Sequence, residues 1–215
     1  KAFTPSGEGP AVPAALRVNA PLVQGLRYGE NPHQQAGLYG AFREFFEQLH
    51  GKELSYNNIL DLTAGAVLIG EFAEDDPTLA ILKHTNPCGI GQGSRLAEAW
   101  EKAFATDRQA PFGGIIAVNR PLDEPCAEAI AGIFSEVIVA PDFEPGALTI
   151  LQRKKNLRLI RMRKPVIDAG EWSVRSVGAG SFLMQQPDTR VTTAADLKIV
   201  TRRQPTEEEL RAMLF

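Results

Sequence analysis

The chain has 215 residues and a formal net charge of −3, with 44% hydrophobic and 23% charged residues, which is typical of a globular protein that needs no disulfide or metal to fold. The acidic balance disfavours non-specific nucleic-acid binding, which normally requires a basic excess. No apolar run reaches the ~20 residues that span a bilayer, and no secretory signal is present. The chain has only two cysteines, Cys88 and Cys126, which suits a reducing compartment. The sequence therefore predicts a cytoplasmic protein without membrane contacts.

The first part of the chain combines a linker with two helical patterns. Residues 1–21 are rich in Pro, Gly and Ala and lack periodicity, which is linker composition. Helices are expected over residues 42–49, stopped by Gly51, and over residues 59–73.

Strand-like and helical patterns alternate from residue 78 onward. Ser94 is available as the N-cap of the helix expected at residues 96–105, and Asp123 as that of the helix expected at residues 125–134; the last helix ends in a cationic run. Strands are expected at residues 78–82, 114–118, 137–140 and 157–160, and helices at residues 96–105, 125–134 and 145–155. This alternation predicts an α/β domain with a substantially parallel sheet.

The last segment begins with alternation over residues 171–184, which predicts a strand or hairpin. Thr206 and Glu209 have capping-box spacing, so a helix should start there. Its apolar face would carry Leu210, Met213 and Leu214. Because the sequence stops about two turns later, we expect it to be a segment of a longer polypeptide.

The segment at residues 82–89, Leu-Lys-His-Thr-Asn-Pro-Cys-Gly, is the first candidate for chemistry. A strand should run into Lys83 and His84 and be broken by the Asn-Pro and Gly that follow, and ligands in open α/β sheets bind beyond the carboxyl ends of strands. The cation of Lys83 would disfavour an imidazolium, so His84 could act as a base. Adjacent strand residues point to opposite faces, however, so both reach one ligand only if the strand has ended. The alternative is a solvated lysine and a histidine satisfied by the loop.

Two further segments are candidates for ligand contact. Residues 27–34, Arg-Tyr-Gly-Glu-Asn-Pro-His-Gln, are polar and contain an arginine suited to phosphate recognition. Residues 111–114, Pro-Phe-Gly-Gly, would let the backbone approach a ligand closely. A surface turn and a tight turn are the respective alternatives.

Metal and covalent chemistry have little support in the sequence. His84 and Cys88 have the spacing of helical co-ligands, but Asn-Pro between them forbids a helix, and no Cys-x-x-Cys is present. Cys88 lacks an evident partner that would activate it as a nucleophile. We therefore expect no catalytic metal.

Taken together, the segments resemble the aminoimidazole carboxamide ribonucleotide (AICAR) formyltransferase part of the bifunctional purine biosynthesis proteins. The ordered matches are residues 27–34, 82–89, 112–114 and 138–141, extended by residues 152–156 and 201–205. The resemblance covers nearly everything from about Val23 to Phe215. Each motif alone is weak, whereas the ordered set is highly specific.

The resemblance implies a cytidine-deaminase-like fold, a three-layer α/β/α domain with a mostly parallel or mixed sheet. Residues 1–21 would be the linker from an upstream inosine monophosphate (IMP) cyclohydrolase domain. Residues 22–204 would form the first of two such subdomains, and residues 205–215 would begin the second.

The resemblance also implies the reaction and its residues. A formyl group passes from 10-formyltetrahydrofolate to the 5-amino group of AICAR, without a metal and in a homodimer. His84 matches the general base and Lys83 the transition-state stabiliser. Four further positions match contacts to the ribonucleotide: Arg27, Tyr28, Gly113 and Glu136. Folate contacts would lie beyond Phe215, so we expect the chain alone not to turn over. A non-catalytic nucleotide-binding module is the alternative, and a zinc deaminase a distant third.

Overall fold

The computed structural model of the protein describes residue 12, residues 14–166 and residues 172–214. The chain divides into two compact units, Lys1–Val166 and Ile167–Phe215. Most of the predicted linker therefore lies outside the described residues. The predicted subdomain boundary at residues 204/205 falls inside the second unit and stays a prediction.

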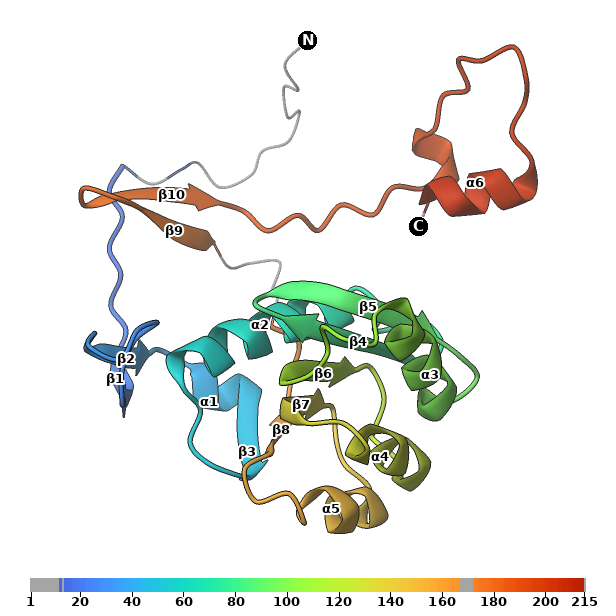
Figure 1. The fold of residues 1–215 in the computed structure, drawn as a ribbon. Helices are drawn as coiled ribbons and strands as arrows, with labels where there is room; N and C mark the ends of the chain where they lie inside the picture. The colour runs from blue at the N-terminus through green and yellow to red at the C-terminus, as the bar shows by residue number, and fades with distance from the viewer. Residues whose placement is uncertain (1–11, 13, 167–171, 215) are drawn as a thin grey trace. The chain divides into compact units, whose positions relative to one another are not determined.

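A six-stranded mixed sheet forms the centre of the first unit (Figure 1). In spatial order its strands are β3 (Phe46–His50), β8 (Arg158–Met162), β7 (Ser135–Ala140), β6 (Gly114–Val118), β4 (Thr78–Lys83) and β5 (Asn86–Gln92). Parallel pairing is confined to β6–β7 and β7–β8, and the other neighbours are antiparallel. The α/β class is confirmed, and the sheet is mixed rather than substantially parallel.

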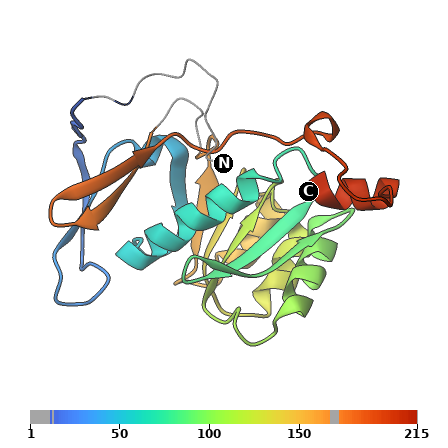
Figure 2. The same ribbon diagram turned by 90° about the horizontal axis from the view of Figure 1, so that it is seen from above.

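Helices cover both faces of this sheet (Figure 2). One face is covered by α2 (Tyr56–Gly70), and the other by α3 (Leu96–Thr106), α4 (Glu124–Ala131) and α5 (Pro145–Leu151). Strand β4 shows how the core is divided, because Leu79 and Ile81 pack in the cluster with α3–α5, whereas Leu82 packs in the cluster with α2. All three are at most 1% exposed. The three-layer α/β/α arrangement follows from this alternation.

Edge strand β5 packs unusually closely on α3. A Cβ on Gly89 would lie 2.1 Å from the Ala103 carbonyl oxygen, and one on Gly91 would lie 2.2 Å from that of Ala99. Strand β4 ends at Lys83, but the expectation that Asn86-Pro87 and Gly89 break the strand is wrong, because all three residues lie within β5. Proline is tolerated because β5 lies at the sheet edge, and the glycines allow the helix to approach the strand.

The prediction of a helix over residues 42–49 is also wrong. Helix α1 (Phe42–Phe45) stops after one turn and β3 pairs with β8. Phe46 is 4% exposed in the core, and the Glu47 carboxylate lies 3.1 Å from the guanidinium groups of both Arg161 and Arg163. The hydrogen bond from Arg163, with that from Arg161, holds the pKa of Glu47 below its ordinary value. Pairing with a strand more than 100 residues away thus overrides a local helical pattern.

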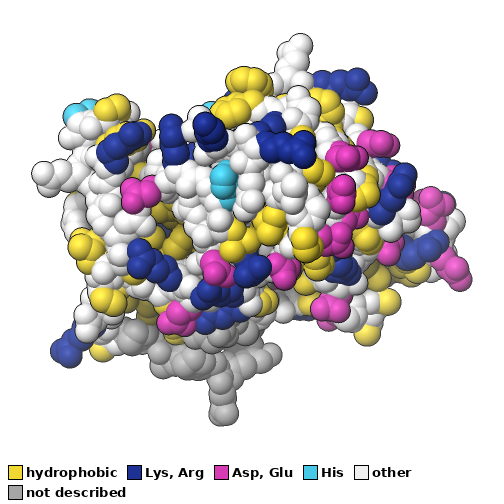
Figure 3. Space-filling view, turned by 90° about the horizontal axis from the view of Figure 1, so that it is seen from below, with side chains coloured by type: hydrophobic (Ala, Val, Ile, Leu, Met, Phe, Trp, Pro, Cys, Tyr) yellow, Lys and Arg dark blue, Asp and Glu magenta, His cyan; other side chains and the backbone are white. Residues whose placement is uncertain are grey.

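Basic and acidic side chains are intermingled over the face of the molecule shown in Figure 3. Among the ion pairs of the sheet, Arg161 bridges two carboxylates, that of Glu47 at 3.1 Å and that of Asp142 at 2.8 Å. These contacts tie β3 and the segment after β7 to β8.

The helix caps agree with the sequence at Asp123 and differ at Ser94. Asp123 accepts the Cys126 amide at 2.9 Å and caps α4 as predicted. Ser94 does not cap α3; its amide and hydroxyl both donate to Glu98 at 2.9 Å. A hydrogen bond from Lys102, the two hydrogen bonds from Ser94 and the charge of Lys102 together lower the pKa of Glu98 to about 2. Helices α4 and α5 end at Ala131 and Leu151, earlier than expected.

The second unit contains the predicted hairpin, formed by antiparallel strands β9 (Ser173–Gly178) and β10 (Ser181–Gln185). A short 3₁₀ turn, η1 (Ala194–Asp196), and helix α6 (Glu207–Leu214) follow. The capping box is confirmed, since Thr206 and Glu209 exchange side-chain-to-amide hydrogen bonds of 2.8 and 3.2 Å. None of the helices in the part of the chain that the structure describes is both long and apolar enough to span a membrane.

Candidate functional site

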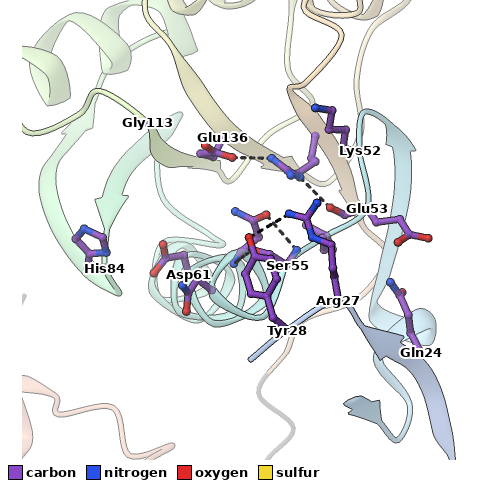
Figure 4. Close-up of a pocket in the computed structure, with 14 residues that line it drawn as sticks. Gln24, Arg27, Tyr28, Lys52, Glu53, Ser55, Asp61, His84, Gly113 and Glu136 are labelled. Atoms are coloured by element: carbon purple, nitrogen blue, oxygen red, sulfur yellow. Dashed lines mark hydrogen bonds and ion pairs between the residues drawn. The ribbon is translucent and has the colours of Figure 1, made fainter. Parts of the chain in front are cut away.

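A cavity of about 590 Å³ opens in the first unit (Figure 4). This volume is within the range of small-molecule sites. Its polar and charged lining residues come from the N-terminal hairpin, the start of α2 and one end of the sheet. They are Gln24, Arg27, Tyr28, Lys52, Glu53, Ser55, Asn57, Asn58, Asp61, His84, Glu136 and Arg158, and Leu54 and Gly113 complete the lining.

The N-terminal wall is carried by a hairpin of β1 (Leu22–Leu26) and β2 (Ala36–Tyr39), with residues 27–34 in the connection. The Arg27 guanidinium donates to the Tyr28 hydroxyl at 3.1 Å and lies 4.8 Å from the centroid of that ring. Among the described residues no carboxylate forms an ion pair with Arg27. The arginine is thus held by an uncharged neighbour, and its charge is available to an anionic ligand.

The amino end of α2 forms the floor. Ser55 and Asn58 make a reciprocal capping box, with bonds of 3.1 and 3.2 Å. This helix end carries partial positive charge, and Lys52 lies three residues before the cap. Asn57 reaches back to the Glu30 carbonyl at 3.5 Å, which links the helix to the hairpin connection.

The sheet contributes residues from one end of four neighbouring strands. His84 follows β4, Gly113 precedes β6, Glu136 lies in β7 and Arg158 begins β8. Because β4 runs antiparallel to β6, its carboxyl end meets the amino ends of the three parallel strands. The cavity therefore lies beyond the carboxyl end of β4, as expected for a ligand site, but at the amino ends of the parallel strands.

Glu136 and Arg158 form an ion pair at the cavity, with 2.6 Å between Arg158 Nη1 and Glu136 Oε2. The arginine side chain is 12% exposed and the glutamate 36%. Arg158 also donates to the Glu53 carbonyl at 3.3 Å. The pair fixes the Glu136 carboxylate while leaving it partly open to the cavity, where it could accept hydroxyl donors from a ligand.

His84 lies in a strained turn. The β4–β5 hairpin closes through two residues, His84 at φ 53° and Thr85 at φ 63°. Positive φ at both positions is typical of a type I′ turn, which favours Asn-Gly. Such conformations cost non-glycine residues about 1–3 kcal/mol each, and they concentrate at functional sites. Gly113 also has a positive φ, 73°, which glycine adopts without strain. Its amide donates to the Phe134 carbonyl at 2.8 Å.

Lys83 is not among the residues that line the cavity. Its Nζ donates to the Phe112 carbonyl at 2.6 Å. Burial raises the pKa of the nearby Cys88 thiol and repulsion from Asp107 adds to this, while Lys83 lowers it. Cys88 packs against the α3–α5 cluster, on the opposite face of the sheet from α2. The side chains of Lys83 and His84 therefore diverge, as the alternation of side chains along a strand predicts.

The structure thus brings together five of the six candidate residues, Arg27, Tyr28, His84, Gly113 and Glu136, but not Lys83. Sequence reasoning missed eight polar residues of the same cavity: Gln24, Lys52, Glu53, Ser55, Asn57, Asn58, Asp61 and Arg158. A signal existed only for Ser55, whose spacing to Asn58 suits a reciprocal cap. Within the described residues no group of three His, Cys, Asp or Glu side chains could hold a metal ion, and the absence of a catalytic metal stays a prediction.

Comparisons with known proteins place the chain in a family. A family profile described as "AICARFT/IMPCHase bienzyme" matches residues 2–215. The bifunctional purine biosynthesis protein PurH of Chloroflexus aurantiacus is 53% identical over 226 residues, which cover 100% of this chain and 44% of that protein. The PurH of Chlorobium luteolum is 48% identical over 217 residues, covering 97% and 41%.

The chain therefore spans less than half the length of these relatives. Among solved structures, RibD of Acinetobacter baumannii overlaps at a TM-score of 0.36 and 16% identity, covering 46% of this chain and 35% of that one, too slight a likeness to bear on the fold. The match along nearly the whole chain and the identity near 50% are decisive: the chain belongs to the AICARFT/IMPCHase bienzyme family.

Proposed function

We propose that this chain supplies the nucleotide site and the general base of an AICAR formyltransferase, with 10-formyltetrahydrofolate as the formyl donor. The observation that carries the proposal is the shared cavity of Arg27, Tyr28, His84, Gly113 and Glu136. The ordered motifs assign these residues to the nucleotide and the base, although they lie up to 109 residues apart in the sequence. IMP cyclohydrolase activity and a homodimer belong to the same proposal for the whole protein.

The lining suits a nucleoside monophosphate with a poorly nucleophilic amine. Arg27 and the amino end of α2 can hold an anion, and Glu136 can accept ribose hydroxyls. The substrate amine is weak because its lone pair is delocalised toward the carboxamide. As the nitrogen attacks the formyl carbon, His84 accepts its proton, which typically contributes ~10²–10⁴-fold to the rate. The tetrahedral oxyanion then collapses and the bond from the formyl carbon to the folate nitrogen breaks. The proton accepted by His84 passes to that nitrogen, so that neutral tetrahydrofolate is released.

A non-catalytic nucleotide-binding module is the second candidate, and one observation favours it. The ammonium of Lys83 is bound to the Phe112 carbonyl and lies outside the cavity. For Lys83 to stabilise the oxyanion, as the resemblance implies, its ammonium must direct one of its two remaining N–H donors into the cavity when the substrates bind.

Formyl transfer by a full-length protein that carries this chain separates the two candidates. The formyltransferase proposal predicts tetrahydrofolate production that requires AICAR and falls by at least ~10²-fold in His84→Ala, while AICAR still binds. Binding without transfer in the unaltered protein would establish the module instead. Lys83→Ala should lower kcat if the lysine stabilises the oxyanion, and Lys102→Ala, on the exposed side of α3, is its matched control.

A further inference from the structure

The His84–Thr85 peptide is held at both of its polar atoms. On one side the His84 carbonyl accepts the Thr85 hydroxyl and the Asn86 side-chain amide, each at 2.7 Å. On the other side the Thr85 amide donates to Asp61 Oδ1 at 2.7 Å. Two of these contacts are local to the turn, whereas Asp61 belongs to α2 and is 24 residues away.

The turn needs this remote contact because its own sequence does not favour it. Left-handed φ is rare for a β-branched residue such as Thr85, and neither turn residue is glycine. The Asp61 carboxylate is fixed by the capped helix α2, and Asp61 and His84 both line the cavity (Figure 4). A rigid helix therefore fixes the peptide plane from which the His84 side chain projects.

We propose that Asp61 is a positioning residue for His84: by binding the Thr85 amide it holds the strained turn and keeps the imidazole in the cavity. Only the chemical role of His84 rests on the function proposed above, since the turn geometry exists without any ligand. The carboxylate acts here as a hydrogen-bond acceptor, so an amide oxygen at the same position should serve equally well.

Nuclear magnetic resonance of the unliganded 215-residue chain tests the positioning directly. A strong intraresidue Hα–HN NOE marks positive φ, so it is expected at His84 and Thr85 in the unaltered chain and in Asp61→Asn. Asp61→Ala should lose both NOEs and speed exchange of the Thr85 amide by at least ~10-fold. Thr85→Gly added to Asp61→Ala should restore the turn, because glycine adopts positive φ freely. Glu71→Ala, at the exposed end of the same helix, is the matched control. Retention of both NOEs in Asp61→Ala would overturn the proposal, as would their loss in Asp61→Asn.

Kinetics in a full-length protein that carries this chain separate positioning from general stability. Asp61→Ala should lower kcat by roughly 10–100-fold with little change in KM for AICAR, because a displaced base loses rate rather than binding. Asp61→Asn should keep kcat near that of the unaltered protein. In the double variant that combines Asp61→Ala with His84→Ala, kcat should be no lower than in His84→Ala alone. Additive losses in that double variant would contradict the proposal. If the unaltered protein shows no transfer at all, the formyltransferase proposal fails, and the resonance experiment still decides the role of Asp61.

Discussion

The ion pair between Glu136 and Arg158 predicts an asymmetric response to mutation. Glu136→Gln leaves a guanidinium that is only 12% exposed without its carboxylate partner. Arg158 keeps the weaker acceptor at the Glu53 carbonyl, so we expect a loss of about 2 kcal/mol in the free energy of unfolding rather than the full cost of an orphaned buried charge. Arg158→Met instead leaves a carboxylate that is 36% exposed and can be hydrated, and should cost about 1 kcal/mol.

Urea unfolding followed by circular dichroism measures both changes. With a slope of about 2 kcal/mol per molar urea, the midpoint should fall by about 1 M for Glu136→Gln and by about half as much for Arg158→Met. Lys164→Met is the control, because its pair with Glu44 has partners 46% and 66% exposed and should be worth under about 0.5 kcal/mol. A larger loss in Arg158→Met than in Glu136→Gln would refute the reasoning from burial.

Three further predictions concern the fold. Gly91→Ala should destabilise the chain by more than about 3 kcal/mol in thermal unfolding, because its Cβ would lie 2.2 Å from a backbone oxygen of α3, while Gly25→Ala, with nothing within 4 Å, should have no such effect. The pKa of Glu98 is depressed in the folded state, so its stabilisation is present above pH ~4.5 and is lost as the pH falls toward 2; urea midpoints should therefore fall less steeply over that window in Glu98→Gln than in the unaltered chain. Burial, with repulsion from Asp123, raises the pKa of Cys126 to about 12, so a thiol reagent at pH 8 should label Cys88 first and Cys126 only on unfolding.

Elements set by local signals were predicted from the sequence. Strand β6 has the predicted bounds of residues 114–118, and the caps at Asp123 and Thr206 are present, because apolar runs and capping spacing act within a few residues. Strand β3 was missed because its residues follow a helical pattern and only the distant partner β8 makes it a strand.

The cavity was predicted less completely than the fold, because contacts between residues distant in the sequence form it. Residue types at 27–34 and 82–89 indicated chemistry, but the family resemblance assigned the roles. Asp61 and Arg158 carried no signal, since each acquires its contact through tertiary structure, with the Thr85 amide and with the Glu136 carboxylate respectively. The divergence of Lys83 from His84 was foreseeable from strand alternation, whereas the tight turn that places His84 was not.

Calorimetric titration of AICAR into the 215-residue chain tests the central claim most directly. We predict saturable binding with one site per chain, weakened by roughly 10–100-fold in Arg27→Ala because a charge-assisted contact to the phosphate is lost. Arg108→Ala, an exposed arginine outside the cavity lining, should leave the affinity unchanged. Saturable binding that is equally strong in Arg27→Ala would contradict the assignment of this cavity to the nucleotide.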